Sequence, residues 1–254
     1  KHPALLYYGD LDGSGKKRIV EAEFEGAICY PIRGKSCSTH AMPSLDRKFG
    51  SYKQFALAEL EDIYPSERLK KATRLDARVL ESGILLNDGQ ARFTFRPLPS
   101  LAQIAPAFGL VACELNGDGH LDLALAQNFF TPQPETGRMD GGLSLVLTGN
   151  GDGTFEALPP RESGVSLFGD AASLSVVDSD WDGRPELAFA VNAANARSYT
   201  QEPGGTLAVR FPMRPGTRMT LKPARGKTQT LEYYAGSGYL SQSAPVLFFA
   251  SPRE

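Results

Sequence analysis

The feature that most constrains how this chain can fold is an acidic loop from Glu114 to Asp122, with the sequence Glu-Leu-Asn-Gly-Asp-Gly-His-Leu-Asp. Carboxylate or amide oxygens stand at its first, third, fifth and ninth positions, and Gly119 stands at the sixth, where the backbone has to turn. A hard cation such as Ca²⁺ requires oxygen ligands spaced in this way. An EF-hand would have a glutamate at position 12 and then a helix, whereas here position 12 is Leu125 and the residues after the loop alternate like a β-strand. The sequence therefore predicts a calcium loop that leads into a strand.

Two further stretches repeat this spacing. Residues 178–186, Asp-Ser-Asp-Trp-Asp-Gly-Arg-Pro-Glu, carry four carboxylates, and residues 10–18, Asp-Leu-Asp-Gly-Ser-Gly-Lys-Lys-Arg, form a degenerate copy. In the degenerate copy Arg18 stands where the last carboxylate should be, so an internal ion pair can replace the ion. The candidate metal ligands of the three loops are Glu114, Asn116, Asp118, His120 and Asp122; Asp178, Asp180, Asp182, Arg184 and Glu186; and Asp10, Asp12 and Ser14.

The alternative for each acidic loop is a solvated turn that holds no ion. Unpaired carboxylates this close together repel one another, and a divalent cation removes that cost. We therefore expect calcium in the loops that begin at Glu114 and Asp178. The seventh position of a calcium loop contributes a backbone carbonyl, so the side chain of His120 should face solvent.

Other landmarks recur along the chain with the loops. Phe108-Gly109 and Phe168-Gly169 precede the two full loops, which begin 64 residues apart (178 − 114 = 64). Asn87-Asp-Gly89 and Asn150-Gly-Asp-Gly153 are typical of turns between strands, and the second lacks the ninth-position acid of a metal loop. A repeat of this size made of short strands is typical of β-propeller blades. In such a blade we expect Trp181 to pack over its neighbour rather than to contact a partner.

Outside the acidic loops, the sequence pattern indicates helices in one segment and a separate group of strands in another. Ser51 and Gln54 fit a capping box, so Tyr52 to Ile63 is predicted to form one helix, with a short helix at Ser66 to Ala72. Beyond Asn195, alternating strands separated by proline and glycine predict a small β-sandwich. The predicted fold is all-β: a partial β-propeller over residues 1–198, with a helical insertion at about 43–73, and a C-terminal small β-sandwich-like domain over residues 199–254.

The composition and the absence of certain motifs limit the functions that this chain can have. A net charge of −2 gives no argument for a nucleic-acid partner, and no apolar run is long enough to span a membrane. There is no Gly-x-Ser-x-Gly nucleophile motif, and His2, His40 and His120 have no sequence partners that suggest a catalytic triad. We therefore expect a non-catalytic binding protein; the alternative is a hydrolase or lyase that acts on polysaccharide.

The three cysteines are Cys29, Cys37 and Cys113. Cys113 lies in a strand pattern and is expected to be a buried thiol. Cys29 and Cys37 are close enough in sequence to form a disulfide, and both that state and the reduced one stay open. Cys37-Ser-Thr-His40 has the residues of half a zinc site, but a second half is missing.

The loops, with their Phe-Gly and Asn-Asp-Gly landmarks, resemble the FG-GAP or VCBS repeats of integrin-type β-propellers. The tail, with Gly226-Lys-Thr-Gln-Thr and then Gly236-Ser-Gly-Tyr-Leu-Ser-Gln-Ser243, resembles the ASPIC/UnbV domain. The stretch from Cys37 to Pro43 is similar to bacterial members, so the whole chain looks like a bacterial relative of the cartilage acidic proteins.

This resemblance implies calcium loops between blade strands and a secreted, periplasmic or cell-surface location. It also implies a binding or adhesion role towards a protein or glycan at a cell surface. Propellers of this kind close with more blades than this chain holds, so we expect further blades upstream.

Overall fold

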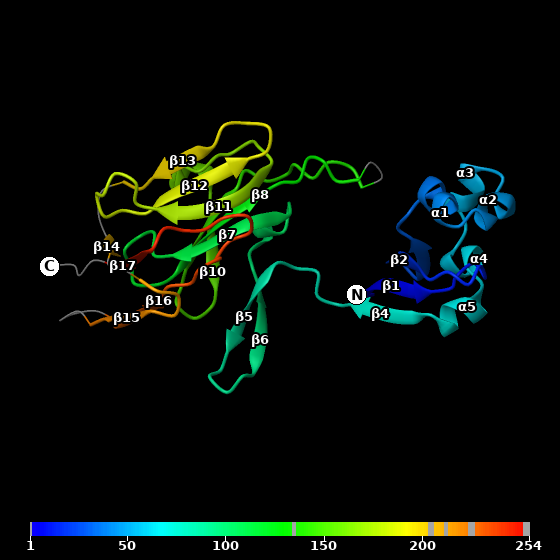
Figure 1. Cartoon of the computed structure of the whole chain (residues 1–254), viewed down its shortest axis with the longest axis horizontal. Coiled ribbons are helices and arrows are strands. Elements are labelled where there is room, and N and C mark those ends of the chain that lie inside the picture. Colours follow the sequence, from blue (N-terminus) through cyan, green and yellow to red (C-terminus); the bar gives the residue numbers. More distant parts are fainter. Residues whose placement is uncertain (1, 134–135, 203–205, 211–212, 223–226, 251–254) are drawn as a thin grey trace. The chain divides into compact units, whose positions relative to one another are not determined.

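The computed structural model describes residues 2–133, 136–202, 206–210, 213–222 and 227–250 (Figure 1). It is mostly β, with 39% strand and 14% helix, and it consists of several small antiparallel sheets. The predicted all-β class fits at this level, and the described residues form no closed barrel. The chain divides into two compact units, residues 1–80 and 81–254.

The first unit has one antiparallel sheet in the order β3-β2-β1-β4. Its strands are β1 (Ala4–Gly9), β2 (Arg18–Glu25), β3 (Ile28–Pro31) and β4 (Thr73–Ala77). Alternate residues of the two central strands point to one face, because side chains on a strand alternate between its two faces. The buried residues on these strands are Leu5, Tyr7, Val20 and Ala22, and they share a core with residues of the helical segment.

The helical segment of the first unit is longer and more broken than predicted. Its helices are α1 (Lys35–Ala41), α2 (Ser44–Lys48), α3 (Tyr52–Ala56), α4 (Leu60–Ile63) and α5 (Ser66–Lys71). The Ser51 hydroxyl accepts a hydrogen bond from the Gln54 amide at 3.2 Å, as the capping box predicts. The prediction of one helix from Tyr52 to Ile63 is wrong, since a second cap at Glu59, closed by the Asp62 side chain, starts a new helix.

The second unit contains five small sheets among its described residues. Their orders are β10-β9-β8-β7, β11-β12-β13, β14-β17, β15-β16 and β5-β6. The strands are β5 (Gly83–Asn87), β6 (Phe93–Pro97), β7 (Ala107–Cys113), β8 (Asp122–Gln127), β9 (Leu145–Gly149), β10 (Phe155–Leu158), β11 (Ala171–Val177), β12 (Glu186–Val191), β13 (Arg197–Thr200), β14 (Thr206–Arg210), β15 (Arg218–Leu221), β16 (Gln229–Glu232) and β17 (Val246–Ala250). Two short helices, η1 (Ser100–Ala102) and α6 (Pro160–Ser163), lie between strands.

The two predicted turns of this unit are confirmed. In the β5–β6 hairpin the Asn87 side chain accepts a hydrogen bond from the Gly89 amide at 2.9 Å. In the β9–β10 hairpin Asp152 accepts one from the Thr154 amide at 2.9 Å. Asn150 to Gly153 is therefore a turn between paired strands, as predicted.

The Phe-Gly landmarks mark points of close packing. A Cβ atom on Gly109 would lie 2.6 Å from the backbone nitrogen of Leu174, so β7 approaches β11 closely only without a side chain there. A Cβ atom on Gly169 would lie 2.6 Å from a methyl of Val191. Gly109 thus lets β7 pack closely on β11, and Gly169, which precedes β11, lets the chain pack closely on β12.

The domain boundary expected at residue 198 falls inside β13, which pairs with β12 (Leu187 opposite Tyr199). Residues 199 and 200 therefore belong to the same sheet as the strand after the second acidic loop. Strands are present beyond Asn195, as predicted, while Gly226 of the tail motif lies outside the described residues. In the part of the chain that the structure describes, no helix is long and apolar enough to cross a membrane.

Candidate metal centre

The three acidic loops join successive antiparallel strands with one common register. The residue before each loop is paired with the ninth residue of the loop: Gly9 with Arg18, Cys113 with Asp122, and Val177 with Glu186. The glycine at position six has a positive φ in each loop, of 78°, 87° and 91° respectively. The shared spacing of the sequence therefore gives the loops a shared backbone path.

The loop at 178–186 brings three of its predicted ligands together. Ligand oxygens of Asp178, Asp180 and Asp182 all lie within 4.8 Å of one another. The side chain of Asp178 is 0% exposed, and its Oδ1 atom has no hydrogen-bond partner. A buried carboxylate oxygen without a partner is strongly unfavourable, and a cation next to it would remove that cost. The donor set of this loop therefore fits a metal ion.

Backbone amides hold the other oxygens of this loop in place. The hydrogen bonds run from Gly183 N to Asp178 Oδ2 (3.0 Å), from Asp182 N to Asp180 Oδ1 (3.1 Å), from Arg184 N to Asp182 Oδ1 (2.8 Å) and from Ser179 N to Glu186 Oε2 (3.0 Å). The acidic side chains are thus oriented by the loop itself before any ion is bound.

Two arginines contact the same loop. Arg210, from β14, forms an ion pair with Asp178 Oδ2, and its guanidinium carbon lies 4.5 Å from the centre of the Trp181 ring. Arg184 pairs with Asp182 and also donates to the backbone carbonyl of Gln201 at 3.1 Å. The hydrogen bond from Arg184 holds the pKa of Asp182 below its ordinary value.

The loop at 114–122 satisfies its first carboxylate internally. Glu114 is 2% exposed and accepts hydrogen bonds from the amides of Asn116 (3.1 Å), Gly117 (2.6 Å) and Gly119 (2.7 Å). Asp122, also buried, accepts from the amides of Leu115 and Gly149, both at 2.9 Å. Burial raises the pKa of both carboxyl groups. Neither leaves an oxygen without a partner.

The sequence predicted that the side chain of His120 faces solvent, but in the structure it packs against a neighbouring turn. Its side chain is half-buried and covers the turn between β9 and β10, where a Cβ atom on Gly151 would come within 2.0 Å of the ring. Its Nε2 atom lies 3.0 Å from the Lys227 ammonium group. The ring thus has a packing role in the second unit, and it does not join the carboxylate cluster at 178–182.

The degenerate loop at 10–18 contains an ion pair, but its partner is not Arg18. Arg68, from α5, lies 3.2 Å from Asp10 Oδ2, while Asp10 also accepts from the amides of Gly13 and Gly15. Asp12 accepts from the Ser14 hydroxyl at 2.7 Å. An arginine from a neighbouring helix therefore provides the positive charge in this loop.

Cys29 and Cys37 form no disulfide with each other. Cys113 is buried, as predicted, and burial raises the pKa of its thiol above the ordinary value.

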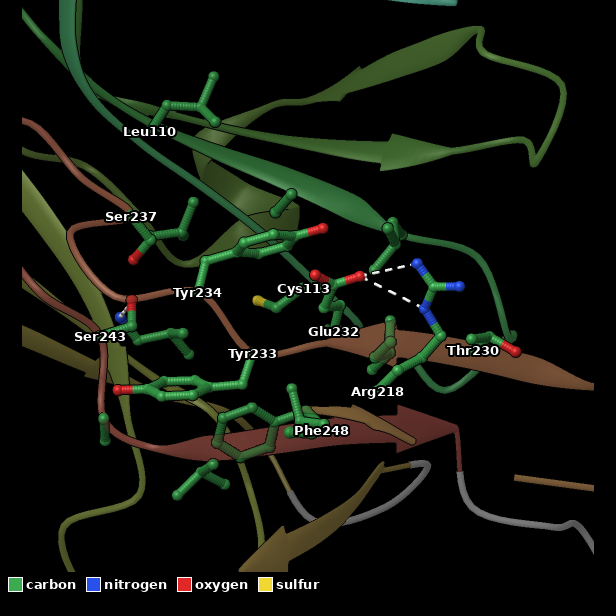
Figure 2. A pocket seen from close by; sticks show the side chains of 18 residues that line it. Leu110, Cys113, Arg218, Thr230, Glu232, Tyr233, Tyr234, Ser237, Ser243 and Phe248 are labelled. Atoms are coloured by element: carbon green, nitrogen blue, oxygen red, sulfur yellow. Dashed lines mark hydrogen bonds and ion pairs between the residues drawn. The ribbon is translucent and has the colours of Figure 1, made fainter. Parts of the chain in front are cut away.

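The second unit also has a pocket of about 540 Å³, and Leu121 of the 114–122 loop contributes to its lining (Figure 2). Its apolar floor includes the buried residues Cys113 and Phe248, and the rings of Tyr233 and Tyr234 line it. At one end Arg218 donates to Glu232 Oε2 from Nη2 at 2.9 Å and from Nε at 3.3 Å. The volume, the apolar floor and the few polar groups are typical of small-molecule sites.

The sequence analysis missed Arg210, Arg68 and this pocket. Arg210 stands in an ordinary alternating strand, and Arg68 lies 58 residues from its partner, so neither has a local signal. One signal was visible: position four is glycine in the other two loops (Gly13 and Gly117), but it is Trp181 here. Trp181 has a φ of +66°, a left-handed conformation that bulky residues rarely adopt.

No known family model matches this chain, and a search of curated proteins finds no match to it.

Proposed function

We propose that this chain is a non-catalytic, calcium-binding module that binds a partner outside the cytoplasm. The observation that carries the proposal is Asp178 Oδ1, a buried and unpartnered oxygen beside the side chains of Asp180 and Asp182. Burying such a polar atom without a partner is costly, and a cation bound at Oδ1 would remove that cost. An all-oxygen donor set on a loop suits Ca²⁺, which accepts flexible geometry, better than softer metals.

The role of the ion would be structural. Residues 178–186 connect β11 to β12, so an ion held there fixes the turn of this hairpin. The 114–122 loop would bind a second ion more weakly, since Glu114 first has to exchange its amide hydrogen bonds. The 10–18 loop would need none, because Arg68 already neutralises Asp10.

Two sheets support the proposed relationship to FG-GAP or VCBS propellers. The sheets β3-β2-β1-β4 and β10-β9-β8-β7 are four-stranded and antiparallel, as propeller blades are. The two-stranded sheets β14-β17 and β15-β16 would belong to the ASPIC/UnbV-like domain. In this proposal the chain is part of a partial propeller, and the protein is secreted, periplasmic or displayed on the cell surface.

The pocket favours a glycan over a protein as the partner. The faces of Tyr233 and Tyr234 offer flat apolar surfaces to sugar rings, while Arg218 and Glu232 offer a donor and an acceptor to neighbouring hydroxyls. The charges of that pair cancel, which favours a neutral saccharide. Glu232 is the one carboxylate among the described lining residues, whereas glycoside hydrolysis normally uses two, so binding is favoured over cleavage.

The metal part of the proposal is tested by the melting temperature in millimolar Ca²⁺ and in excess chelator. We expect Ca²⁺ to raise the melting temperature of the wild type but not that of the Asp180→Ala, Asp182→Ala double variant. Asp140→Ala, which removes an exposed acid paired with Arg138, is the control and should keep the shift. An unchanged melting temperature in the wild type would refute the metal site.

The partner is tested on an array of neutral glycans. The wild type should bind, and Tyr234→Ala should lose binding because it removes an aromatic wall of the pocket. Tyr52→Ala removes a similarly exposed tyrosine of the first unit and should bind normally. Equal binding by all three proteins would place the glycan contact away from this pocket.

A further inference from the structure

We propose that Arg210 sets the metal affinity of the 178–186 loop by taking the position of the cation at Asp178 while the loop is metal-free. This inference rests on the metal site proposed above and adds the residue that controls it. Arg210 comes from outside the loop, from the last residue of β14.

The contact between Arg210 and Asp178 differs from an ordinary surface ion pair. The side chain of Asp178 is 0% exposed and that of Arg210 is 25% exposed, so the pair is largely withdrawn from water. β14 is held by β17, with Arg210 opposite Val246, so the arginine is presented by a paired strand and not by a free loop. Arg210 uses Nη2 on Asp178 Oδ2, while Asp178 Oδ1 has no partner. The arginine therefore balances the charge of the carboxylate, while the Gly183 amide donates to Oδ2 and Oδ1 stays without a hydrogen bond.

Trp181 gives Arg210 a second contact. The guanidinium carbon lies 4.5 Å from the ring centre, within the range of a cation–π interaction. The two equivalent positions, Gly13 and Gly117, are glycines with φ of +82° and +80°, whereas Trp181 takes φ +66° with a full side chain. Of the two full loops of the second unit, the one with an aromatic ring at position four is thus also the one whose first carboxylate contacts an arginine.

Charge makes the two occupants of the loop exclusive. A metal ion bound by Asp178, Asp180 and Asp182 and the guanidinium of Arg210 would share one carboxylate, and like charges at that distance repel. Arg210 must therefore leave Asp178 when the three carboxylates bind an ion. Because metal binding has to break the Arg210–Asp178 contact, the energy of that contact weakens metal binding. The position of Arg210 over Trp181 therefore changes with metal occupancy.

The chain has one tryptophan, which makes this inference measurable. Tb³⁺ takes the same oxygen ligands as Ca²⁺ and emits light when a nearby tryptophan is excited. Titrations with Tb³⁺, followed by displacement with Ca²⁺, would be carried out on the full chain of the wild type, Arg210→Gln and Arg92→Gln. Arg92→Gln is the matched control, because it also breaks an arginine–carboxylate pair and removes one positive charge, but on the β5–β6 hairpin.

We expect Arg210→Gln to bind Tb³⁺ and Ca²⁺ about tenfold more tightly than the wild type, as the loss of a competing charged contact implies. Arg92→Gln should bind as the wild type does. The tryptophan emission of metal-free Arg210→Gln should match that of the wild type saturated with Ca²⁺, because both lack the Arg210–Trp181 contact. Arg210→Lys, which keeps the charge but not the planar group, should bind with intermediate affinity and provides a variant that disturbs β14 less.

The outcomes separate this inference from the proposed function. If the wild type binds metal and folded Arg210→Gln binds it equally well or more weakly, the role of Arg210 is overturned and the metal site stays in place. Absence of Tb³⁺ binding by both proteins, each folded by circular dichroism, would overturn the metal site and the role of Arg210 together.

Discussion

The loops at 114–122 and 178–186 follow the same path between paired strands but neutralise their first carboxylate in different ways. In the former, Glu114 accepts three hydrogen bonds from amides of its own loop. In the latter, Asp178 accepts one, from Gly183, and meets a cation from another strand, Arg210. Both side chains are buried, so each must find partners.

The residue at position four accounts for much of this difference. The amide of Gly117 donates to Glu114 Oε1 and that of Gly13 donates to Asp10 Oδ1, whereas Asp178 Oδ1 has no partner in the loop that has Trp181 at this position. The spacing of the acids fixes the path of the loop, while the presence or absence of this amide donor decides whether the loop needs a cation. A loop that looks like a metal site in sequence can therefore be complete without one.

The largest expected effect comes from removing the first carboxylate of each loop in the absence of metal. Glu114→Ala strips three loop amides, one buried and two partly buried, of their acceptor and should lower the free energy of unfolding by about 3 kcal/mol. Asp178→Ala should cost less, because it strips one amide, that of Gly183, and because Arg210, which is 25% exposed, can turn to solvent. Urea denaturation of both variants in excess chelator measures the difference. Equal losses would mean that the two loops are satisfied in the same way.

Bound metal should make the 178–186 loop the more important of the two loops for stability. At free Ca²⁺ about 100-fold above the dissociation constant, the wild type should gain about 3 kcal/mol of stability. Asp182→Ala should abolish most of that gain, because it removes a member of the only carboxylate cluster found among the described residues. Asp118→Ala, the matched change at position five of the other loop, should keep most of it. A larger loss from Asp118→Ala than from Asp182→Ala, in denaturation with and without Ca²⁺, would contradict the ranking of the sites.

The sequence predicted the parts of the fold and site that depend on local pattern. Strands follow all three acidic loops, as predicted, because alternating apolar residues and a glycine at the turn suffice to specify a hairpin. The helix from Tyr52 was predicted too long, because the competing cap at Glu59 is also a local signal and was overlooked.

Contacts between distant segments were beyond prediction. Arg68 and Arg210 meet their carboxylates only after α5 and β14 have been placed, and nothing in an alternating strand marks which arginine will do so. The pocket likewise combines β7 with strands near the C-terminus, including Phe248 of β17. The proposed propeller and its calcium ions stay predictions for the same reason, since both depend on how repeats assemble.

The pH dependence of stability should differ in sign between the two loops in chelator. The pKa of Glu114 is raised above its ordinary value of 4.5 by burial, so the folded state binds the proton more tightly. Its contribution is thus fully present below that value and declines as the pH rises through the folded pKa. The pKa of Asp182 is lowered from 3.8, chiefly by Arg184, so its contribution is present above 3.8 and is lost as the pH falls.

Glu114→Gln and Asp182→Asn isolate these two contributions. Stability measured from about pH 3 to about pH 7 should decline less with rising pH in Glu114→Gln than in the wild type. In Asp182→Asn the loss on acidification should be slightly smaller than in the wild type, because solvent screens the contribution of an exposed carboxylate. Profiles parallel to the wild type in both variants would show that neither carboxyl group titrates differently on folding.

The smallest expected effect is at position four of the loops. Trp181 adopts a left-handed conformation that costs about 1–2 kcal/mol for a residue with a Cβ atom, and Trp181→Gly removes this strain. The same change removes the contact with Arg210, worth about 0.5–1 kcal/mol. The two terms nearly offset each other, so Trp181→Gly in chelator should change stability by less than about 1 kcal/mol.

Trp181→Ala separates the two terms, because alanine loses the contact with Arg210 but keeps the strained conformation. It should therefore be less stable than Trp181→Gly by about 1 kcal/mol in urea denaturation. The opposite order would mean that the left-handed conformation carries no strain in this loop. A tryptophan would then need no compensating contact, and the difference between this loop and the one at 114–122 would lie in the first carboxylate alone.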